Sequence, residues 1–151
     1  MTNRPAIANS WFDDFVQFIK WQEPNISFVS ESDSLKNRTA LSREKYLEIA
    51  MSSGEEITTK FIAFVSLQDL KGAYKFGGAI KKLDWVADLK WDLLVVDEAH
   101  EGVDTSKTDW AFSRIIRDFT LHLSGTPFKA LANSKFNVNQ IYGSVLEFRT
   151  V

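Results

Sequence analysis

Two clusters of polar residues in this sequence could carry out chemistry, and each directly follows an apolar run. Asp97-Glu98-Ala99-His100 comes after Leu93–Val96, and Ser124-Gly125-Thr126-Pro127 comes after Leu121–Leu123. An apolar strand that ends in two carboxylates suits the hydrolysis of a nucleoside triphosphate. Asp97 can hold Mg²⁺ through its water shell, while Glu98 can orient or deprotonate the attacking water.

Each cluster also has an ordinary structural interpretation. An Asp-Glu pair after a strand often lies in a solvated loop or caps a helix. Ser-Gly-Thr-Pro often forms a turn in which Thr126 caps a helix that begins at Pro127. Because ligands of parallel sheets collect at the carboxyl ends of the strands, the position of both clusters after apolar runs favours the chemical interpretation.

The sequence around the clusters predicts helices that alternate with strands. Pro5 suits the first position of a helix whose apolar residues recur at four-residue spacing as far as Ile19. Strands are expected at 26–30, 61–66, 93–96 and 120–123, and further helices at 42–51 and from about 108 to 119. This alternation is typical of βαβ units, so the predicted fold class is α/β with a mostly parallel, three-layer sheet.

The same patterns predict which side chains face the core. The consecutive apolar residues at 93–96 predict a strand that is buried on both faces. The glycine-rich stretch 71–82 is expected to form a surface loop. The buried faces of the first and last helices are expected to contain Ile7, Trp11, Phe12, Phe15 and Ile19, and Ala111, Phe112, Ile115 and Phe119, respectively.

The composition is that of one globular domain. The chain has 151 residues, 44% of them hydrophobic, no Cys, and 18 Lys and Arg against 20 Asp and Glu, for a net charge of −2. These values exclude a disordered tail, a disulfide-stapled module and a Cys-based metal site. No apolar run approaches the roughly 18 residues of a membrane span, and the amino-terminal residues do not form a signal peptide, so a cytoplasmic protein is expected.

Other chemistries have weaker support in the sequence. His100 and His122 do not form a His-Glu-x-x-His zinc motif, and no Gly-x-Ser-x-Gly nucleophile elbow is present. The five Trp residues are spread along the chain and are expected mainly in the core or at its rim. A small basic loop is expected to be a solvated turn, with DNA contact as the alternative; it contains Lys71, Lys75, Lys81 and Lys82.

Four segments, in order, resemble the motor domain of DEAD/DEAH-box helicases and translocases of superfamily 2. Residues 97–100 look like motif II, which is the Walker B motif, and 121–127 look like motif III. Residues 91–102 are similar to the DEAH region of the restriction subunits of type I and type III restriction enzymes. Residues 4–11 resemble motif Ia of that group, and 65–70 resemble the strand end that precedes its DEAH motif. The resemblance covers nearly the whole chain and implies one partial RecA-like domain over 1–151.

The resemblance also implies residue roles. Asp97 would hold the Mg²⁺ of Mg-ATP through water, and Glu98 would be the catalytic base for ATP hydrolysis. A second group of residues would couple the nucleotide state to the DNA-bound state. A third group would contact phosphates of the DNA strand along which the motor moves, without reading its sequence. The coupling residues are His100, Ser124 and Thr126, and the phosphate-contacting residues are Thr2, Arg4, Pro5, Ser66 and Gln68. The implied partners are double-stranded DNA and methyltransferase or specificity subunits of a restriction-modification complex.

The chain departs from that family in one important motif. The G-x-x-x-x-G-K-[ST] loop that cradles phosphates is missing. Gly72–Ala79 has two glycines at the right spacing, but Gly78 and Ala79 stand where Lys and Ser or Thr are required. The second motor domain with its arginine fingers is absent too, so the chain is expected to be an inactive fragment of a motor, trimmed at both ends. The alternatives are a remnant with only a structural or interaction role, and an RNA or general DNA helicase.

Overall fold

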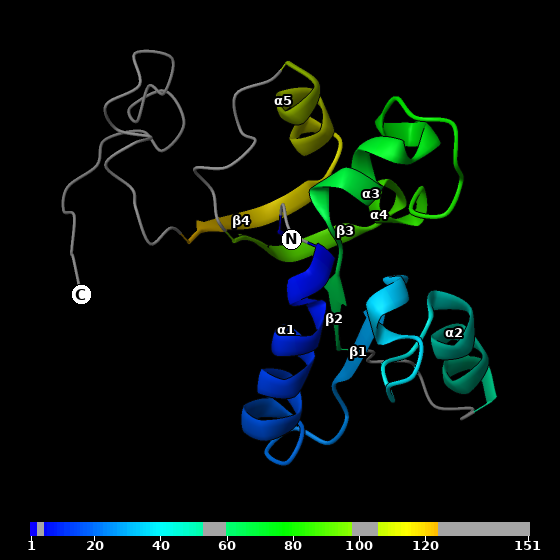
Figure 1. Cartoon of the computed structure of the whole chain (residues 1–151), viewed down its shortest axis with the longest axis vertical. Helices are drawn as coiled ribbons and strands as arrows, with labels where there is room; N and C mark the ends of the chain where they lie inside the picture. The colour runs from blue at the N-terminus through cyan, green and yellow to red at the C-terminus, as the bar shows by residue number, and fades with distance from the viewer. Residues whose placement is uncertain (3–4, 53–59, 98–105, 124–151) are drawn as a thin grey trace, which may run out of the picture.

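The computed structural model describes residues 1–2, 5–52, 60–97 and 106–123, which form helices packed around short parallel strands (Figure 1). The strands are β1 (Ser27–Ser30), β2 (Phe61–Phe64), β3 (Lys90–Val96) and β4 (Ile116–His122). The helical segments are η1 (Pro5–Ile7), α1 (Ala8–Asp14), η2 (Phe15–Ile19), η3 (Asp33–Leu35), α2 (Arg43–Ser52), α3 (Leu67–Gly72), η4 (Tyr74–Phe76), α4 (Trp85–Asp88) and α5 (Ser106–Ser113).

The strands form two parallel pairs. β1 pairs with β2, with Ser30 opposite Phe64, and β3 pairs with β4, with Val96 opposite His122. Helical segments separate the strands along the chain, as parallel pairing requires. The expected α/β class with parallel strands is therefore confirmed.

The amino-terminal residues Met1 and Thr2 lie between the two strand pairs. Thr2 forms parallel bridges both to Ser66, just after β2, and to Asp97, just after β3. At their carboxyl ends the strands therefore follow one another in the order β1, β2, Met1–Thr2, β3, β4. Figure 1 shows the N-terminus at the centre of the molecule, close to β3.

Two hydrophobic clusters fill the interior. The first, here called the aromatic cluster, joins α1 and η2 to β1 and β2 around Phe28, whose ring centroid lies 5.3 Å from those of Phe12 and Phe15. The second, the main cluster, joins α2, α3, α4 and α5 to the strands and includes Val29, the neighbour of Phe28. Because neighbouring strand residues point to opposite faces, helical segments cover both faces of the β1–β2 pair.

The local signals in the sequence explain several helix boundaries. Phe12 and Phe15 are buried on the inner face expected for the first helix. The Lys45 amide donates to Ser42 Oγ at 3.2 Å, so Ser42 caps α2. The stretch expected to be a surface loop instead contains the end of α3 and the 3₁₀ turn η4.

The expectations for α5 and β4 were wrong at their boundary. Phe119 was expected on a buried helical face, but α5 ends at Ser113, and Phe119 lies in β4 with 71% of its surface exposed. The Arg117 guanidinium donates to the carbonyls of Phe112 and Ile115 at 2.5 and 2.9 Å. These bonds satisfy carbonyl groups at the end of the helix, and the chain turns there into an extended strand.

The prediction that 93–96 is buried on both faces was also wrong. Leu94 and Val96 are buried against the main cluster, whereas Leu93 is 50% exposed. Leu93 pairs with Phe119, and Leu121 on the same strand is 47% exposed. Leu93, Phe119 and Leu121 therefore lie on a partly exposed face of β3 and β4. Among the described residues, no helix is long and apolar enough to cross a membrane.

We expect the main cluster to contribute most of the stability of the fold, and a substitution at Leu70 tests this expectation. The Leu70 side chain is fully buried, so Leu70→Ala is expected to lower the free energy of unfolding by about 2–5 kcal/mol in urea titrations. Leu47→Ala removes the same atoms from a side chain that is 39% exposed, and we expect a change near 0.5 kcal/mol. Equal losses in the two variants would contradict this assignment of the core.

Candidate functional site

The carboxyl ends of the strands form an edge that is rich in buried polar side chains. Among the described side chains, the buried polar ones are Thr2, Ser30 and Ser66, with 1%, 8% and 2% of their surfaces exposed. Ser30 ends β1, Ser66 follows β2, and Thr2 lies between β2 and β3. Together with Asp97, which follows β3, these residues define what we call the carboxyl edge.

Backbone hydrogen bonds bring the parts of this edge together. The Thr2 amide donates to the Val65 carbonyl at 3.2 Å, and the Leu67 amide donates to the Thr2 carbonyl at 2.7 Å. The Asp97 amide donates to the Met1 carbonyl at 2.8 Å. The positions of Ser66, Asp97 and Ser124 after apolar runs predict that all three lie at one edge of a single parallel sheet. Ser66 and Asp97 do lie at one edge, joined through Thr2, but the described strands form two separate pairs and not one sheet, and Ser124 lies outside the described residues.

Asp97 supplies the carboxylate of the edge. Its side chain is half-buried, and the indole Nε1 of Trp11, on α1, donates to its Oδ2 at 3.3 Å. The Met1 amine lies close enough for Asp97 to act on its charge. Burial lowers the pKa of this amine from its ordinary value of 8.0 to about 6, and the Asp97 carboxylate opposes part of that shift.

Ser66 and Gln68 lie at the start of α3 but differ in accessibility. Ser66 Oγ accepts from the Asp69 amide at 3.0 Å and donates to Asp69 Oδ2 at 2.7 Å, so Ser66 is the N-cap of the helix. Its hydroxyl is buried in this role. Gln68, two residues after Ser66, is exposed. Ser66 and Gln68 were both expected to contact phosphate, and of this pair Gln68 is the residue whose side chain is exposed.

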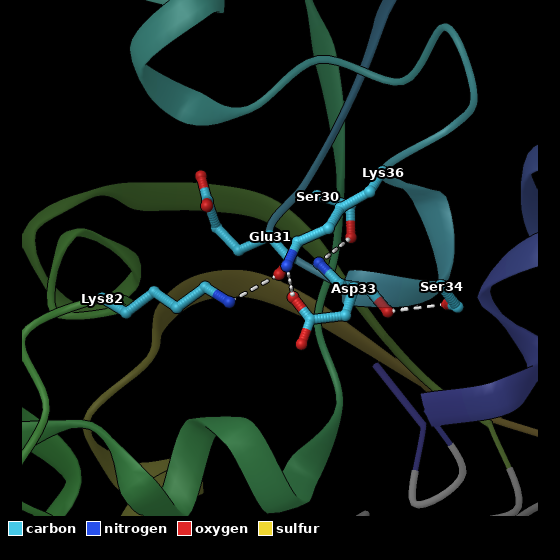
Figure 2. Close-up of polar contacts among 7 residues, drawn as sticks. Ser30, Glu31, Asp33, Ser34, Lys36 and Lys82 are labelled. Atoms are coloured by element: carbon cyan, nitrogen blue, oxygen red, sulfur yellow. Dashed lines mark hydrogen bonds and ion pairs between the residues drawn. The ribbon is translucent and has the colours of Figure 1, made fainter.

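Ser30 belongs to this edge and was not singled out from the sequence. Its Oγ donates to the Phe64 carbonyl and accepts from the Ser32 amide, both at 3.1 Å. Figure 2 shows this turn, where Lys82 also donates to the Glu31 carbonyl at 2.6 Å. The sequence could have identified Ser30, because it is a polar residue at the end of an apolar strand segment, as Ser66 and Asp97 are.

Several expected site residues lie outside the described residues. They are Arg4, Glu98, His100, Ser124 and Thr126. The described residues next to two of these segments lie at the carboxyl edge. Pro5 opens η1 directly after the edge, and the Leu123 amide donates to the Val96 carbonyl at 2.8 Å, so β4 ends beside Asp97.

The glycine-rich segment after α3 uses its own backbone amides. The amides of Gly78 and Ile80 donate to the carbonyls of Ala73 and Gly72 at 2.8 and 3.1 Å. A Cβ atom on Gly78 would come within 2.0 Å of the Gly72 carbonyl oxygen, so close backbone approach explains the glycine. This arrangement supports the interpretation of the segment as a structural turn and not as a phosphate-binding loop.

Mg-ATP fits the carboxyl edge only in part. Mg²⁺ in proteins commonly uses one or two carboxylates and takes its remaining ligands from water and phosphate, and Asp97 suits that use. Among the described residues, no three His, Cys, Asp or Glu side chains gather to hold a metal. The sequence lacks the phosphate-cradling loop, so of the groups that Mg-ATP needs, only a carboxylate is present at the described part of this edge.

Comparison with known protein families gives no match, and comparisons with curated proteins and with solved structures give none either.

The buried Met1 amine predicts a pH dependence of stability. The amine has a pKa of about 6 when folded and near 8.0 when unfolded, so between these values the unfolded chain binds the extra proton. The free energy of unfolding should therefore rise from pH 6 to pH 8 by up to about 3 kcal/mol, and the contribution should level off outside that window.

Urea titrations across this pH range test the prediction, with the N-terminally acetylated chain as the matched control. Acetylation removes the titrating amine and leaves all other groups, so the difference between the two forms isolates its contribution. Identical pH profiles for the acetylated and unmodified chains would show that the amine is not buried as described.

Proposed function

We propose that this chain is part of the first RecA-like domain of an ATP-dependent DNA translocase of the restriction-enzyme type. The supporting observation is the carboxyl edge, where Thr2, Ser66 and Asp97 meet through parallel backbone bridges. These residues come from three segments with separate resemblances to motor motifs, and the first and last of them, Thr2 and Asp97, are 95 positions apart along the chain. Short resemblances that arise by chance have no reason to converge on one edge of a fold.

The chemistry of the edge agrees with a role in nucleoside triphosphate hydrolysis. Asp97 presents a half-buried carboxylate whose Oδ2 is oriented by the Trp11 indole. Mg-ATP would supply the reacting phosphoryl group and the metal charge. Asp97 would hold that metal through a water ligand, and Glu98, the next residue, would be the group that accepts a proton from water.

The DNA contact is proposed for the neighbouring part of the same edge, at the start of α3. Gln68 is exposed on the first turn of α3, while Ser66 and Thr2 are buried and hold the backbone at that point. Arg4 and Pro5 follow Thr2 directly, which connects this position to the motif Ia resemblance. Contacts of this type position a strand by its phosphates and do not read the bases.

A second candidate is a chain that serves only as a structural or interaction domain. The exposed apolar residues on one face of β3 and β4, among them Leu93 and Phe119, favour it, since such surfaces commonly mark contact sites. An RNA or general DNA helicase motor is a further alternative, because the same edge chemistry would serve either nucleic acid.

The isolated chain is expected not to hydrolyse ATP. Phosphoryl transfer depends on positioning and charge stabilisation, and the chain lacks both the phosphate-binding Lys and an arginine finger. Phosphate release with and without Mg²⁺ should equal the blank for both the natural chain and Glu98→Gln. Mg²⁺-dependent release that Glu98→Gln abolishes would contradict this expectation.

The proposed DNA contact predicts weak, salt-sensitive binding. Two or three phosphate contacts give a slope of roughly −2 to −3 in the logarithm of affinity against the logarithm of salt concentration. Fluorescence anisotropy with a short DNA duplex should show this slope. Arg4→Ala should make the slope shallower by about one, because it removes a cation, whereas Gln68→Ala should weaken binding and leave the slope unchanged, because glutamine is neutral.

Arg114→Ala is the matched control for the DNA measurement. Arg114 is exposed but precedes β4, at the amino ends of the strands and away from the carboxyl edge. Its removal should leave binding nearly unchanged. Equal losses for Arg4→Ala and Arg114→Ala would place the DNA elsewhere, and tighter binding to an RNA duplex of the same sequence would favour the RNA motor.

A further inference from the structure

A groove separates α2 from the segment that carries η4 and α4. Its volume is about 890 Å³, and its two walls come from α2 on one side and from residues between 74 and 88 on the other. Glu31, just after β1, also borders it. The residues of the carboxyl edge do not line this groove, so it is separate from the site described above.

The wall formed by α2 presents carboxylates and apolar side chains in one stripe. Glu44, Leu47, Glu48 and Met51 border the groove at the spacing of a single helix face. Leu47 and Met51 are 39% and 79% exposed. Within the described part of the chain, neither Glu44 nor Glu48 forms an ion pair. We call this stripe the acidic wall.

The carboxylates of the opposite wall are already engaged by that wall itself. Asp84 Oδ1 accepts from the Lys75 amide at 2.8 Å, and Asp88 forms an ion pair with the Lys75 side chain. These contacts hold η4 against α4. The two aspartates therefore leave little uncompensated negative charge on this wall.

The lysines of the same wall remain available. Lys81 and Lys82 are exposed, and neither forms an ion pair with a described residue. The Lys82 ammonium donates only to a neutral group, the Glu31 carbonyl (Figure 2). Tyr74, 66% exposed, adds an apolar surface beside them. We call this surface the basic wall.

Contacts from Arg43 hold the two walls in place. Its guanidinium lies over the Trp85 ring, 5.8 Å from the centroid, and its amide donates to Glu31 Oε1 at 2.9 Å. A cation over an indole face is attracted to it, so this contact ties the start of α2 to α4. The groove therefore has a fixed form, with opposite charges on its two walls that do not pair within one chain.

We propose that this groove binds the same groove of a second copy of the chain, around a two-fold axis that runs along it. When two copies face each other in this way, rotation about the axis exchanges the walls, so each acidic wall lies opposite the basic wall of the other copy. The carboxylates then face the ammonium groups twice in one interface, and the exposed apolar side chains of both walls are covered together. This inference does not depend on the proposed function.

The distribution of charge favours a second copy over other partners. A nucleic acid would be attracted by the basic wall and repelled by the acidic wall. Any partner has to present both signs in parallel rows with the spacing of this groove, and a second copy does so because it carries the same two walls in reverse order. The opposite docking order is disfavoured, since it would bring like-charged walls together.

Sedimentation equilibrium of the natural chain is the first test. The average mass should rise from 17.2 kDa toward twice that value as the protein concentration is raised. The association should weaken when salt is added, because the charged rows are exposed in the single chain. A mass that stays at 17.2 kDa at every concentration would overturn the inference.

Two charge-reversed variants test whether the groove is the surface that associates. Glu44→Lys with Glu48→Lys makes both walls basic, and Lys81→Glu with Lys82→Glu makes both walls acidic. Each variant alone should bind itself about tenfold more weakly than the natural chain or worse, because like-charged walls then face each other. An equimolar mixture should associate again, since a basic groove faces an acidic one, and this recovery also shows that both variants are folded.

Asp14→Lys with Glu23→Lys is the matched control. These two carboxylates are exposed, at the end of α1 and beyond η2, and their reversal changes the net charge by as much as that of the acidic wall does. The control should associate like the natural chain. Association that persists in both groove variants, a mixture that does not associate, or an equal loss in the control would overturn the inference.

Discussion

Four backbone hydrogen bonds made by Met1 and Thr2 hold the two parallel strand pairs together. Two of these bonds go to the β2 side, at Val65 and Leu67, and two go to the β3 side, at Val95 and Asp97. Each bond contributes on the order of 1 kcal/mol, but their positions matter more than their sum, because they align the carboxyl ends of strands from distant parts of the chain. Without this alignment Ser66 and Asp97 would belong to separate edges.

The alignment explains why polar side chains are buried at this edge. Ser30 and Ser66 use their hydroxyls to bond the Phe64 carbonyl and the start of α3, so these buried groups are satisfied. Asp97 remains half-buried with an indole donor from α1. The edge therefore combines rigid hydroxyl residues that fix the backbone with one carboxylate that stays partly accessible, which is the arrangement that a strand-end site requires.

The sequence predicted the alternation of helices and strands, and it predicted the common edge of Ser66 and Asp97 because each follows an apolar run. It did not reveal the role of Met1 and Thr2, since a two-residue strand carries no periodic signal. Phe119 was misplaced because its spacing from Ile115 fits a helix, whereas α5 ends at Ser113 and Phe119 lies in β4. Leu93 was expected to be buried because an apolar run does not show which face its neighbours cover. Glu98 and Ser124 were predicted from motifs alone and stay predictions.

Whether Met1 and Thr2 join the two strand pairs is tested most directly by NMR detection of scalar couplings across hydrogen bonds in an isotope-labelled chain. We expect couplings from the Leu67 amide to the Thr2 carbonyl and from the Asp97 amide to the Met1 carbonyl. The coupling from the Leu123 amide to the Val96 carbonyl is the internal reference, because it lies within the β3–β4 side. A spectrum that shows the reference coupling but neither of the other two would contradict the account.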